Sequence, residues 1–304
     1  MIAPALPVPT SSDIRKGILY MIAACGVFTA VNAIVKGLTA TYPVTEIAFF
    51  RGVFALIPCL YLIATHGGFS TLRTRVLPQH VGRAMLQFTS MVLAFSALGL
   101  MPLADMVAIQ FAAPLFMTAL SVPLLGEKVG IYRWSAVVVG FVGVLIMVGP
   151  GGDVMRLGAL LVLGNTVISA VVSLALRRMS ATESSTTLVT YQIVVTAVLG
   201  CIVAPFGWIN PASLGDLAML ISVGLCSGVG QFWWTQALRL APAAVVAPFS
   251  YTSMIWAMAL GFLVWGDLPT ASLLIGGAIV ASSGLYILYR ETVRRVKPSA
   301  TDPH

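Results

Sequence analysis

The sequence predicts an all-α polytopic membrane protein of ten transmembrane helices, built as two inverted five-helix repeats. Three observations predict this fold class: the apolar composition, the length of the apolar runs and an internal repeat. Of the 304 residues, 59% are apolar and 9% are charged, whereas an average soluble domain has about 25% charged residues. A soluble chain of this size cannot bury so much apolar surface in one core, but a bilayer accepts it on the outer faces of the helices.

The chain contains apolar runs of about twenty residues, the length that an α-helix needs to cross the hydrocarbon layer. Gly, Pro or charged residues separate these runs, as at Tyr42-Pro43, Met101-Pro102 and Gly266-Asp267. Because most of the breaks are short, consecutive helices must be antiparallel neighbours. The ten predicted spans are 17–38, 44–65, 80–100, 104–125, 131–149, 157–176, 184–204, 214–238, 244–264 and 271–289.

The positions of Lys and Arg predict the orientation in the membrane. If the N-terminus is cytoplasmic, fourteen of the 17 Lys and Arg residues fall on the inner side, Lys36 and Arg156 fall outside, and Arg51 lies within a span. We therefore expect a multi-pass protein of a bacterial-type inner membrane with both termini in the cytoplasm. The net charge of +7 reflects this topology and predicts no nucleic-acid partner, because the chain has no basic soluble domain.

An internal repeat relates the two halves of the chain. After a shift of about 140 residues, 97–104 falls on 237–244 with five of eight positions identical, and Gly126-Glu127 falls on Gly266-Asp267. Each half contains an odd number of spans, so the second half must enter the membrane from the opposite face. Inverted repeats with a substrate site between them are typical of alternating-access transporters. The predicted divisions are 1–152 for the first repeat, 153–292 for the second and 293–304 for a cytoplasmic tail.

Several short motifs in this order resemble those of a known family. Pro43 followed by Phe50-Arg51, the two Ala-Leu-x-Leu-x-Pro segments, Pro114 and Leu125-Gly126-Glu127 resemble EamA-type carriers of the drug/metabolite transporter superfamily. The resemblance implies a ten-helix bundle with a central cavity that moves metabolites, amino acids or drugs. Within that family, exporters of hydrophobic or aromatic amino acids fit this weakly charged chain best. One departure is Gln192, which stands where the first half has Arg51, so an anion contact there would be one-sided.

Polar residues within spans are the candidates for a substrate site, because they are costly in a bilayer and usually face a cavity or another helix. Arg51 lies about 10 Å from the outer end of its span. It either anchors a substrate carboxylate or serves structurally, by reaching the interface or pairing with Glu46 or Asp105. Lys36, Glu46 and Asp105 form either an outer polar vestibule or an ion-pair network that locks the outer ends.

The remaining candidates are aromatic, hydroxyl and amide side chains. Trp256 lies too deep for the interfacial aromatic belt, so it either packs between helices or lines a cavity, and we expect the cavity. Tyr251, Ser253 and Trp256 do not share a single helical stripe, so at most part of this set lines a cavity. Each amide side chain either lines the cavity or only bonds to a neighbouring helix. The predicted substrate-binding residues are Arg51, Gln87, Gln110, Gln192, Tyr251, Ser253 and Trp256. The glycines of the fifth and tenth spans predict close packing of these two helices: Gly140, Gly143, Gly276, Gly277 and Gly284.

Other function classes find little support in the sequence. His66, His80 and His304 lie at helix ends or in the tail, and no metal-ligand cluster, phosphate loop or nucleophile with a base appears. We therefore expect no enzyme, no cofactor and no metal. A channel is a lesser alternative, because the chain shows no charged ring or selectivity-filter motif. No acidic residue lies near a span centre, so we predict a facilitative carrier. We expect it to act on a small metabolite and to be a monomer. The alternative is a proton-coupled multidrug or metabolite carrier that uses Glu46 or Asp105.

Overall fold

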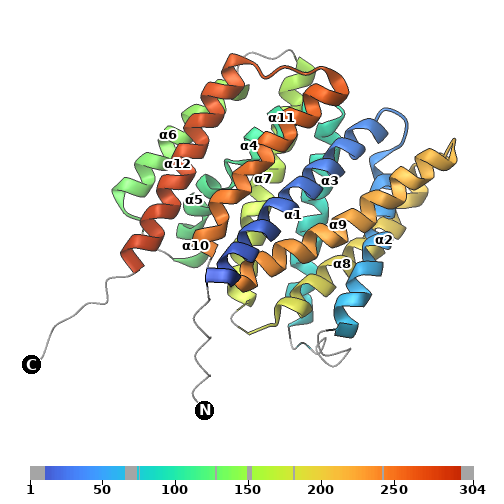
Figure 1. Ribbon diagram of the computed structural model, residues 1–304, viewed down its shortest axis with the longest axis horizontal. Helices are drawn as coiled ribbons and strands as arrows, with labels where there is room; N and C mark the ends of the chain where they lie inside the picture. The colour runs from blue at the N-terminus through green and yellow to red at the C-terminus, as the bar shows by residue number, and fades with distance from the viewer. Residues whose placement is uncertain are drawn as a thin grey trace, which may run out of the picture.

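The computed structural model describes residues 11–65, 74, 76–126, 129–148, 153–180, 182–241 and 243–295. Within these ranges all regular secondary structure is helical, and the helices run up and down through one bundle (Figure 1). The elements are α1 (Ser11–Leu38), α2 (Val44–Thr65), α3 (Leu77–Leu98), α4 (Leu103–Gln110), α5 (Ala113–Leu125), α6 (Ile131–Val148), α7 (Asp153–Met179), α8 (Ser185–Val203), η2 (Ala204–Phe206), α9 (Leu214–Leu240), α10 (Ala243–Val246), η3 (Ala247–Tyr251), α11 (Thr252–Trp265) and α12 (Ala271–Arg295).

These elements confirm the predicted ten spans. Among the described residues, 10 helical segments are long and apolar enough to cross a membrane, with α4 and α5 together forming one of them. The first residue of α1 and the last residue of α12 lie at the same end of the bundle, at the bottom of Figure 1. We call this the terminal end, and the other the opposite end.

The fourth and ninth spans, predicted over 104–125 and 244–264, are each broken near a proline that lies inside the apolar run. In the fourth span, α4 ends at Gln110 and α5 begins at Ala113, with Pro114 in its first turn. In the ninth span, the 3₁₀ segment η3 carries Pro248 in its first turn and leads into α11. Proline has no N–H for the helical ladder, so each break occurs where the chain supplies one. Both breaks fall at equivalent positions of the two repeats.

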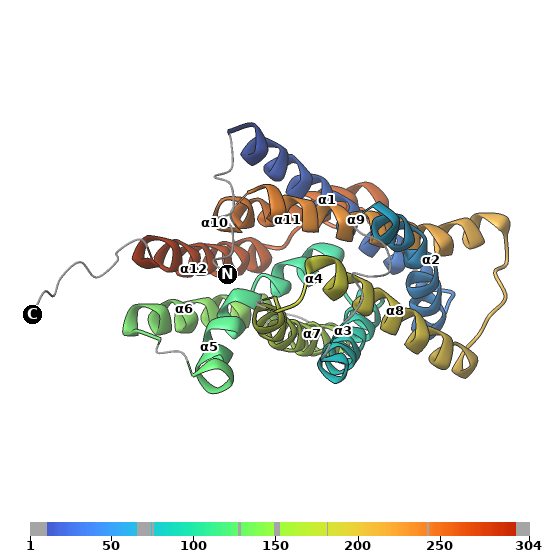
Figure 2. The ribbon, with the colours of Figure 1, turned by 90° about the horizontal axis from the view of Figure 1, so that it is seen from below.

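The packing of the helices is symmetric under exchange of the two halves. The contact of α1 with α9 has its counterpart in that of α7 with α3, and the contact of α2 with α9 in that of α8 with α3. Three spans pack directly on their own counterparts: the second on the seventh (α2 on α8), the fourth on the ninth (α4 on α11) and the fifth on the tenth (α6 on α12). Figure 2 shows α6 beside α12 at one edge of the bundle and α2 near α8 and α9 at the other. This arrangement confirms the inverted repeat.

Two local features repeat with the same symmetry. Gly126 ends α5 and Gly266 ends α11, and both have a positive φ, of 68° and 71°. A side chain is strained in this left-handed region, so a glycine at each position lets the helix end sharply. The shift of about 140 residues seen in the sequence therefore relates equivalent turns in the structure.

Small residues bring helices of the two halves close together. A Cβ atom on Gly143 of α6 would lie 2.8 Å from the Gly276 carbonyl oxygen of α12, so no larger residue fits. This confirms the expected close packing of the fifth and tenth spans. Gly140 and Gly284 make room for side chains from other helices instead: Gly140 faces Leu115 of α5, and Gly284 faces the hydroxyl of Tyr251.

Candidate functional site

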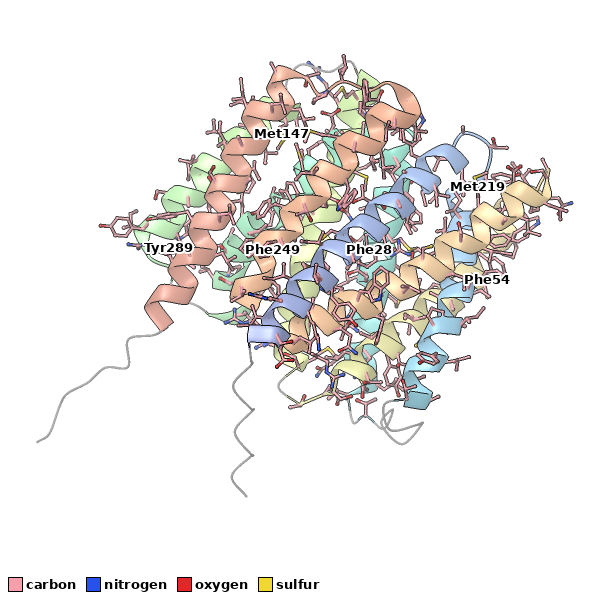
Figure 3. The ribbon with its side chains drawn as sticks, in the orientation of Figure 1. Phe28, Phe54, Met147, Met219, Phe249 and Tyr289 are labelled. Atoms are coloured by element: carbon pink, nitrogen blue, oxygen red, sulfur yellow. The ribbon has the colours of Figure 1, made fainter. Side chains whose placement is uncertain are left out.

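Two cavities lie in the described part of the chain, and the larger of this pair, with a volume of about 530 Å³, lies between the halves. Segments of α1, α4, α5, α7, α9, η3, α11 and α12 surround it. Its wall combines aromatic rings with neutral polar groups, and Arg177 is the charged residue among the described lining. The rings belong to Phe28, Phe111, Trp234 and Tyr251. Phe28 lies about half-way along α1, in the middle of the bundle (Figure 3).

The cavity extends from the broken helices toward the terminal end. Its deepest lining includes Gln110 and Phe111, at the break of the fourth span, and Ser250, at the break of the ninth. At the terminal end it reaches Arg177 in the last turn of α7 and Leu238 near the end of α9. In this conformation the cavity therefore approaches the terminal end of the bundle and not the opposite end.

Two counterpart residues of the repeats meet in the cavity wall. The rings of Phe111 and Tyr251 have centroids 4.6 Å apart at an interplanar angle of 47°. The repeat shift places Phe111 on Tyr251, so a contact between them lies at the axis that relates the two halves. Gln110 and Ser250 are a second counterpart pair in the same wall.

Hydrogen bonds hold Gln110 at this position. Its Nε2 donates to Asn165 Oδ1 at 3.1 Å, and Asn165 Nδ2 donates to the Ser90 carbonyl at 2.8 Å. Asn165 and Ser90 are buried. The amide of Gln110 is thus fixed by a polar connection that joins α4 to α7 and α3, which orients it before any substrate binds.

The second cavity has a volume of about 250 Å³ and lies between α2, α3, α7, α8 and α9. Its polar lining is Arg51, Arg83, Gln87, Gln192, Ser227 and Gln231, with Ser173 and Thr196. Arg83 is buried, and its Nη2 donates to the Leu188 carbonyl at 2.7 Å. The guanidinium of Arg51 lies 5.3 Å from the centre of the Phe95 ring. The two cavities therefore differ in character: one is aromatic and nearly neutral, and the other is small and cationic.

An ion pair ties α1 to the segment after α11 at the opposite end. Lys36 Nζ lies 3.0 Å from Asp267 Oδ2 and 4.6 Å from the centre of the Trp265 ring. Asp105 at the start of α4 is buried and interacts electrostatically with both charges. We call Lys36, Asp105, Trp265 and Asp267 the outer clamp. The outer clamp joins the first repeat to the second at the opposite end, whereas the cavity approaches the terminal end.

The predicted binding residues divide between the two cavities. Gln110, Tyr251 and Ser253 line the larger one, and Arg51, Gln87 and Gln192 line the smaller. Trp256 lines neither, which corrects its expected position. Its side chain is 42% exposed, and its ring lies against Gly26 of α1. In a bilayer an apolar ring on the lipid side is stable, so depth in the span did not determine the direction of the side chain.

The predicted outer residues lie at the expected end but do not share a space with Arg51. Lys36 and Asp105 belong to the outer clamp, whereas Glu46 is fully buried and accepts a hydrogen bond from the Ile209 N–H at 3.0 Å. None of the three is among the described residues that line either cavity. Arg51 makes no ion pair with Glu46 or Asp105 within the described part of the chain. These contacts favour the interpretation of Lys36, Glu46 and Asp105 as groups that lock the helix ends over their interpretation as an open vestibule.

Several lining residues were not predicted from the sequence. Phe111 could have been found, because the repeat shift places it on Tyr251. Asn32 is a polar residue within the first span, which is the signal that identified the glutamines. Arg83 was assigned to the inner surface with the other basic residues, yet it is 6% exposed within α3. Phe28 and Trp234 carry no signal that separates a cavity-lining ring from a lipid-facing one.

Residues 15–149 and residues 156–290 each match the EamA-like transporter family. The chain belongs to this family. Each matched range covers five of the ten spans, so the two copies correspond to the two structural repeats. As an EamA-like transporter the chain is a multi-pass membrane protein that transports small molecules, and it is not an enzyme.

Relatives of this EamA-like transporter are similar over most of their length. A riboflavin transporter from Vibrio cholerae is 29% identical over 280 residues, covering 91% of this chain and 94% of the relative. The pseudopaline exporter CntI of Pseudomonas aeruginosa is 28% identical, covering 88% and 94%. An S-adenosylmethionine uptake transporter of Rickettsia prowazekii is 28% identical, covering 81% and 83%. A solved crystal structure shares the fold, with a TM-score of 0.62 and 18% identity over 95% of this chain and 99% of the other.

Proposed function

We propose that this EamA-like transporter carries a small amphipathic metabolite with an aromatic ring through the larger cavity. The observation that carries this proposal is the contact of Phe111 with Tyr251, 4.6 Å between ring centroids, at the axis between the repeats. A ring bound there meets aromatic faces from both halves, so it stays in contact with the protein as the halves move. Ligand sites between inverted repeats are typical of alternating-access carriers.

The composition of the cavity wall supports this substrate class. Aromatic pairs favour offset or edge-to-face contact with another ring, while Asn32, Gln110 and Ser253 offer hydrogen bonds to polar substituents. The volume of about 530 Å³ lies within the usual range for small-molecule sites, roughly 300–1,000 Å³. Aromatic amino acids, which the sequence predicted, have this chemistry. A flavin has it as well, and the Vibrio cholerae relative is named for riboflavin.

The proposed mechanism is alternating access with the terminal end facing the cytoplasm, as the distribution of Lys and Arg predicts. In this state the cavity approaches the terminal end, and the outer clamp joins the repeats at the opposite end. Release of the clamp and closure around Arg177 and Leu238 would give the other state. Such motion is a rocking of one repeat against the other around a fixed site.

The test is substrate flux in proteoliposomes that contain the purified protein. The panel is tryptophan, riboflavin, alanine and leucine, and we expect flux of tryptophan or riboflavin to exceed flux of the two amino acids without an aromatic ring. Tyr251→Ala should reduce that flux about tenfold or more, because the ring contact is worth about 1.5 kcal/mol in a closed site. Trp256→Ala is the matched control, since it removes an aromatic ring outside the cavity and should leave flux near the parent value. Flux confined to alanine or leucine, or equal loss in both variants, would contradict the proposal.

A further inference from the structure

The smaller cavity holds two arginines, with no carboxylate among its described lining residues. Glu183, which precedes α8, is engaged with other residues: it accepts a hydrogen bond from Thr74, and its carboxylate lies 3.5 Å from His80 Nε2. Among the described residues Arg51 has neither a hydrogen bond nor an ion pair, and its guanidinium lies over the Phe95 ring. A cationic side chain buried in the hydrocarbon layer is expensive unless an anion neutralises it.

Three buried polar atoms in the same wall have no hydrogen-bond partner within the described part of the chain. They are Arg83 Nε, Gln192 Oε1 and Ser227 Oγ. Arg83 and Ser227 are 6% and 5% exposed, so bulk water does not solvate them freely. Buried polar groups are nearly always paired, and a group of unpaired ones around a cavity indicates a polar occupant. A guanidinium N–H and a hydroxyl can both donate to one oxyanion.

We propose that the smaller cavity binds a free organic anion through a carboxylate or phosphate group held by Arg51 and Arg83. This site is distinct from the ring-binding cavity, and it stands even if the proposed substrate class is wrong. The volume of about 250 Å³ is below the usual range for drug-sized ligands, so the occupant is small. The amide N–H groups of Gln87 and Gln231 and the hydroxyl of Ser227 would donate its remaining hydrogen bonds.

Depth argues for a free anion over a lipid headgroup. Arg83 lies six residues into α3, about 9 Å from the terminal end, but Arg51 lies fourteen residues before the end of α2, about 20 Å from it. Headgroups lie outside a hydrocarbon core of about 30 Å. A headgroup phosphate could approach Arg83, whereas contact with both arginines requires an anion that enters the bundle.

The test measures thermal unfolding of the purified chain in nanodiscs of zwitterionic lipid. The probes are succinate and inorganic phosphate, each at about 10 mM and compared with chloride at equal ionic strength, since a ligand that binds the folded state raises Tm. We expect at least one probe to raise the Tm of the parent protein by about 2–4 °C. Arg51→Gln should abolish this rise without lowering the Tm measured in chloride, because the lost charge had no partner.

Two further variants separate a specific site from general effects. Arg83→Gln should also abolish the rise, although it removes the bond to Leu188 and so lowers the starting Tm. Arg239→Gln removes the same charge from an exposed position on α9 and should keep the full rise. The proposal is wrong if neither probe raises the Tm of the parent, or if the rise persists in Arg51→Gln. It is also wrong if the Tm rises only when anionic lipid replaces the zwitterionic lipid, because the cavity would then hold a headgroup.

Discussion

At the scale of single residues, the contact between Gly284 and Tyr251 determines the shape of the larger cavity. The Tyr251 hydroxyl occupies the space where a Cβ on Gly284 would lie. This glycine on α12 lets the ring lie back against the helix, beside Phe111, so the space in front of the ring stays open. Glycine in a helix is otherwise less favourable than alanine by about 1 kcal/mol.

We therefore predict that Gly284→Ala lowers flux without destabilising the fold. The new methyl group must push the Tyr251 ring toward the cavity, which reduces both its volume and the ring contact offered to a substrate. Flux of the preferred substrate should fall about fivefold or more, since displacement of a positioning group by a fraction of an ångström is costly. The measurements are flux in proteoliposomes and Tm of the same preparation.

Gly82→Ala is the matched control for this substitution. Gly82 lies in α3, and a Cβ atom there would meet no neighbouring atom within 4 Å. Its flux should equal that of the parent, and its Tm should stay the same or rise. If Gly284→Ala also transports as the parent does, the placement of Tyr251 does not limit the cavity.

At the scale of helices, the outer clamp connects α1 to the turn that follows α11. The Lys36 and Asp267 side chains are 15% and 31% exposed, so the ion pair is only partly screened by solvent. Because Lys36 belongs to the first repeat and Asp267 to the second, separation of the repeats at this end breaks the pair. The clamp thus favours the state in which the cavity approaches the terminal end.

We predict that Asp267→Asn shifts the protein toward the state open at the opposite end. Loss of a partly exposed pair is worth about 1 kcal/mol, which is roughly a fivefold change in the ratio of the two states. The reporter is Asn32→Cys, in the cavity wall, in a chain whose four native cysteines are replaced by Ser, because Cys25 lines the same cavity and Cys201 is exposed. A membrane-impermeant maleimide applied at the opposite end should label Asn32→Cys faster when Asp267→Asn is present.

The exchanged pair Lys36→Asp with Asp267→Lys tests whether attraction between the charges is responsible. It restores opposite charges across the same gap, so labelling from the opposite end should return to the parent rate. Equal labelling of the parent and Asp267→Asn would mean that the clamp does not bias the two states.

At the scale of the whole molecule, the positions of the acidic groups bear on energy coupling. Glu46 and Asp105 are buried near the opposite end, and neither lines either cavity among the described residues. A group that carries protons through a transport cycle must reach both sides of the membrane in turn. The larger cavity has neutral polar and aromatic residues at the depth where such a group is needed.

We therefore predict flux without obligatory proton movement. Substrate-driven flux in liposomes without a pH gradient should persist while a pH-sensitive dye in the external medium shows no change. Glu46→Gln and Asp105→Asn should each retain this flux. A fixed ratio of protons to substrate that either variant abolishes would instead assign coupling to the outer residues.

The orientation of the molecule is a separate prediction at this scale. Fourteen of 17 Lys and Arg residues lie on the side of the termini in the predicted topology. Cysteines introduced at Ser12 and Ser299 should therefore resist an impermeant reagent in intact cells and react after the membrane is made permeable. Labelling of either position in intact cells would reverse the assignment of the terminal end to the cytoplasm.

The sequence by itself determined the fold class, the span positions and the inverted repeat. These properties depend on features that a single chain displays along its length: apolar runs, short breaks, and a shift that relates Pro102 to Pro242 and Gly126 to Gly266. It also identified Gln110, Tyr251, Arg51 and Gln192 as polar or aromatic residues within spans, because such residues are costly in lipid wherever they point.

Only the tertiary structure decided which of these residues share a cavity. The sequence predicts how deep a residue lies along a membrane helix. It does not predict whether the side chain points to lipid or to protein, because both sides of such a helix are equally apolar. Trp256 and Tyr251 lie close in sequence, yet Tyr251 faces Phe111 in the cavity and Trp256 lies outside it. Arg51 and Arg83 come from different helices, and packing of the two repeats brings them to one cavity. In a soluble protein, the apolar face of a helix determines which side chains point inward. A membrane helix has no such single apolar face, so contacts with helices distant in sequence determine its rotation about its own axis.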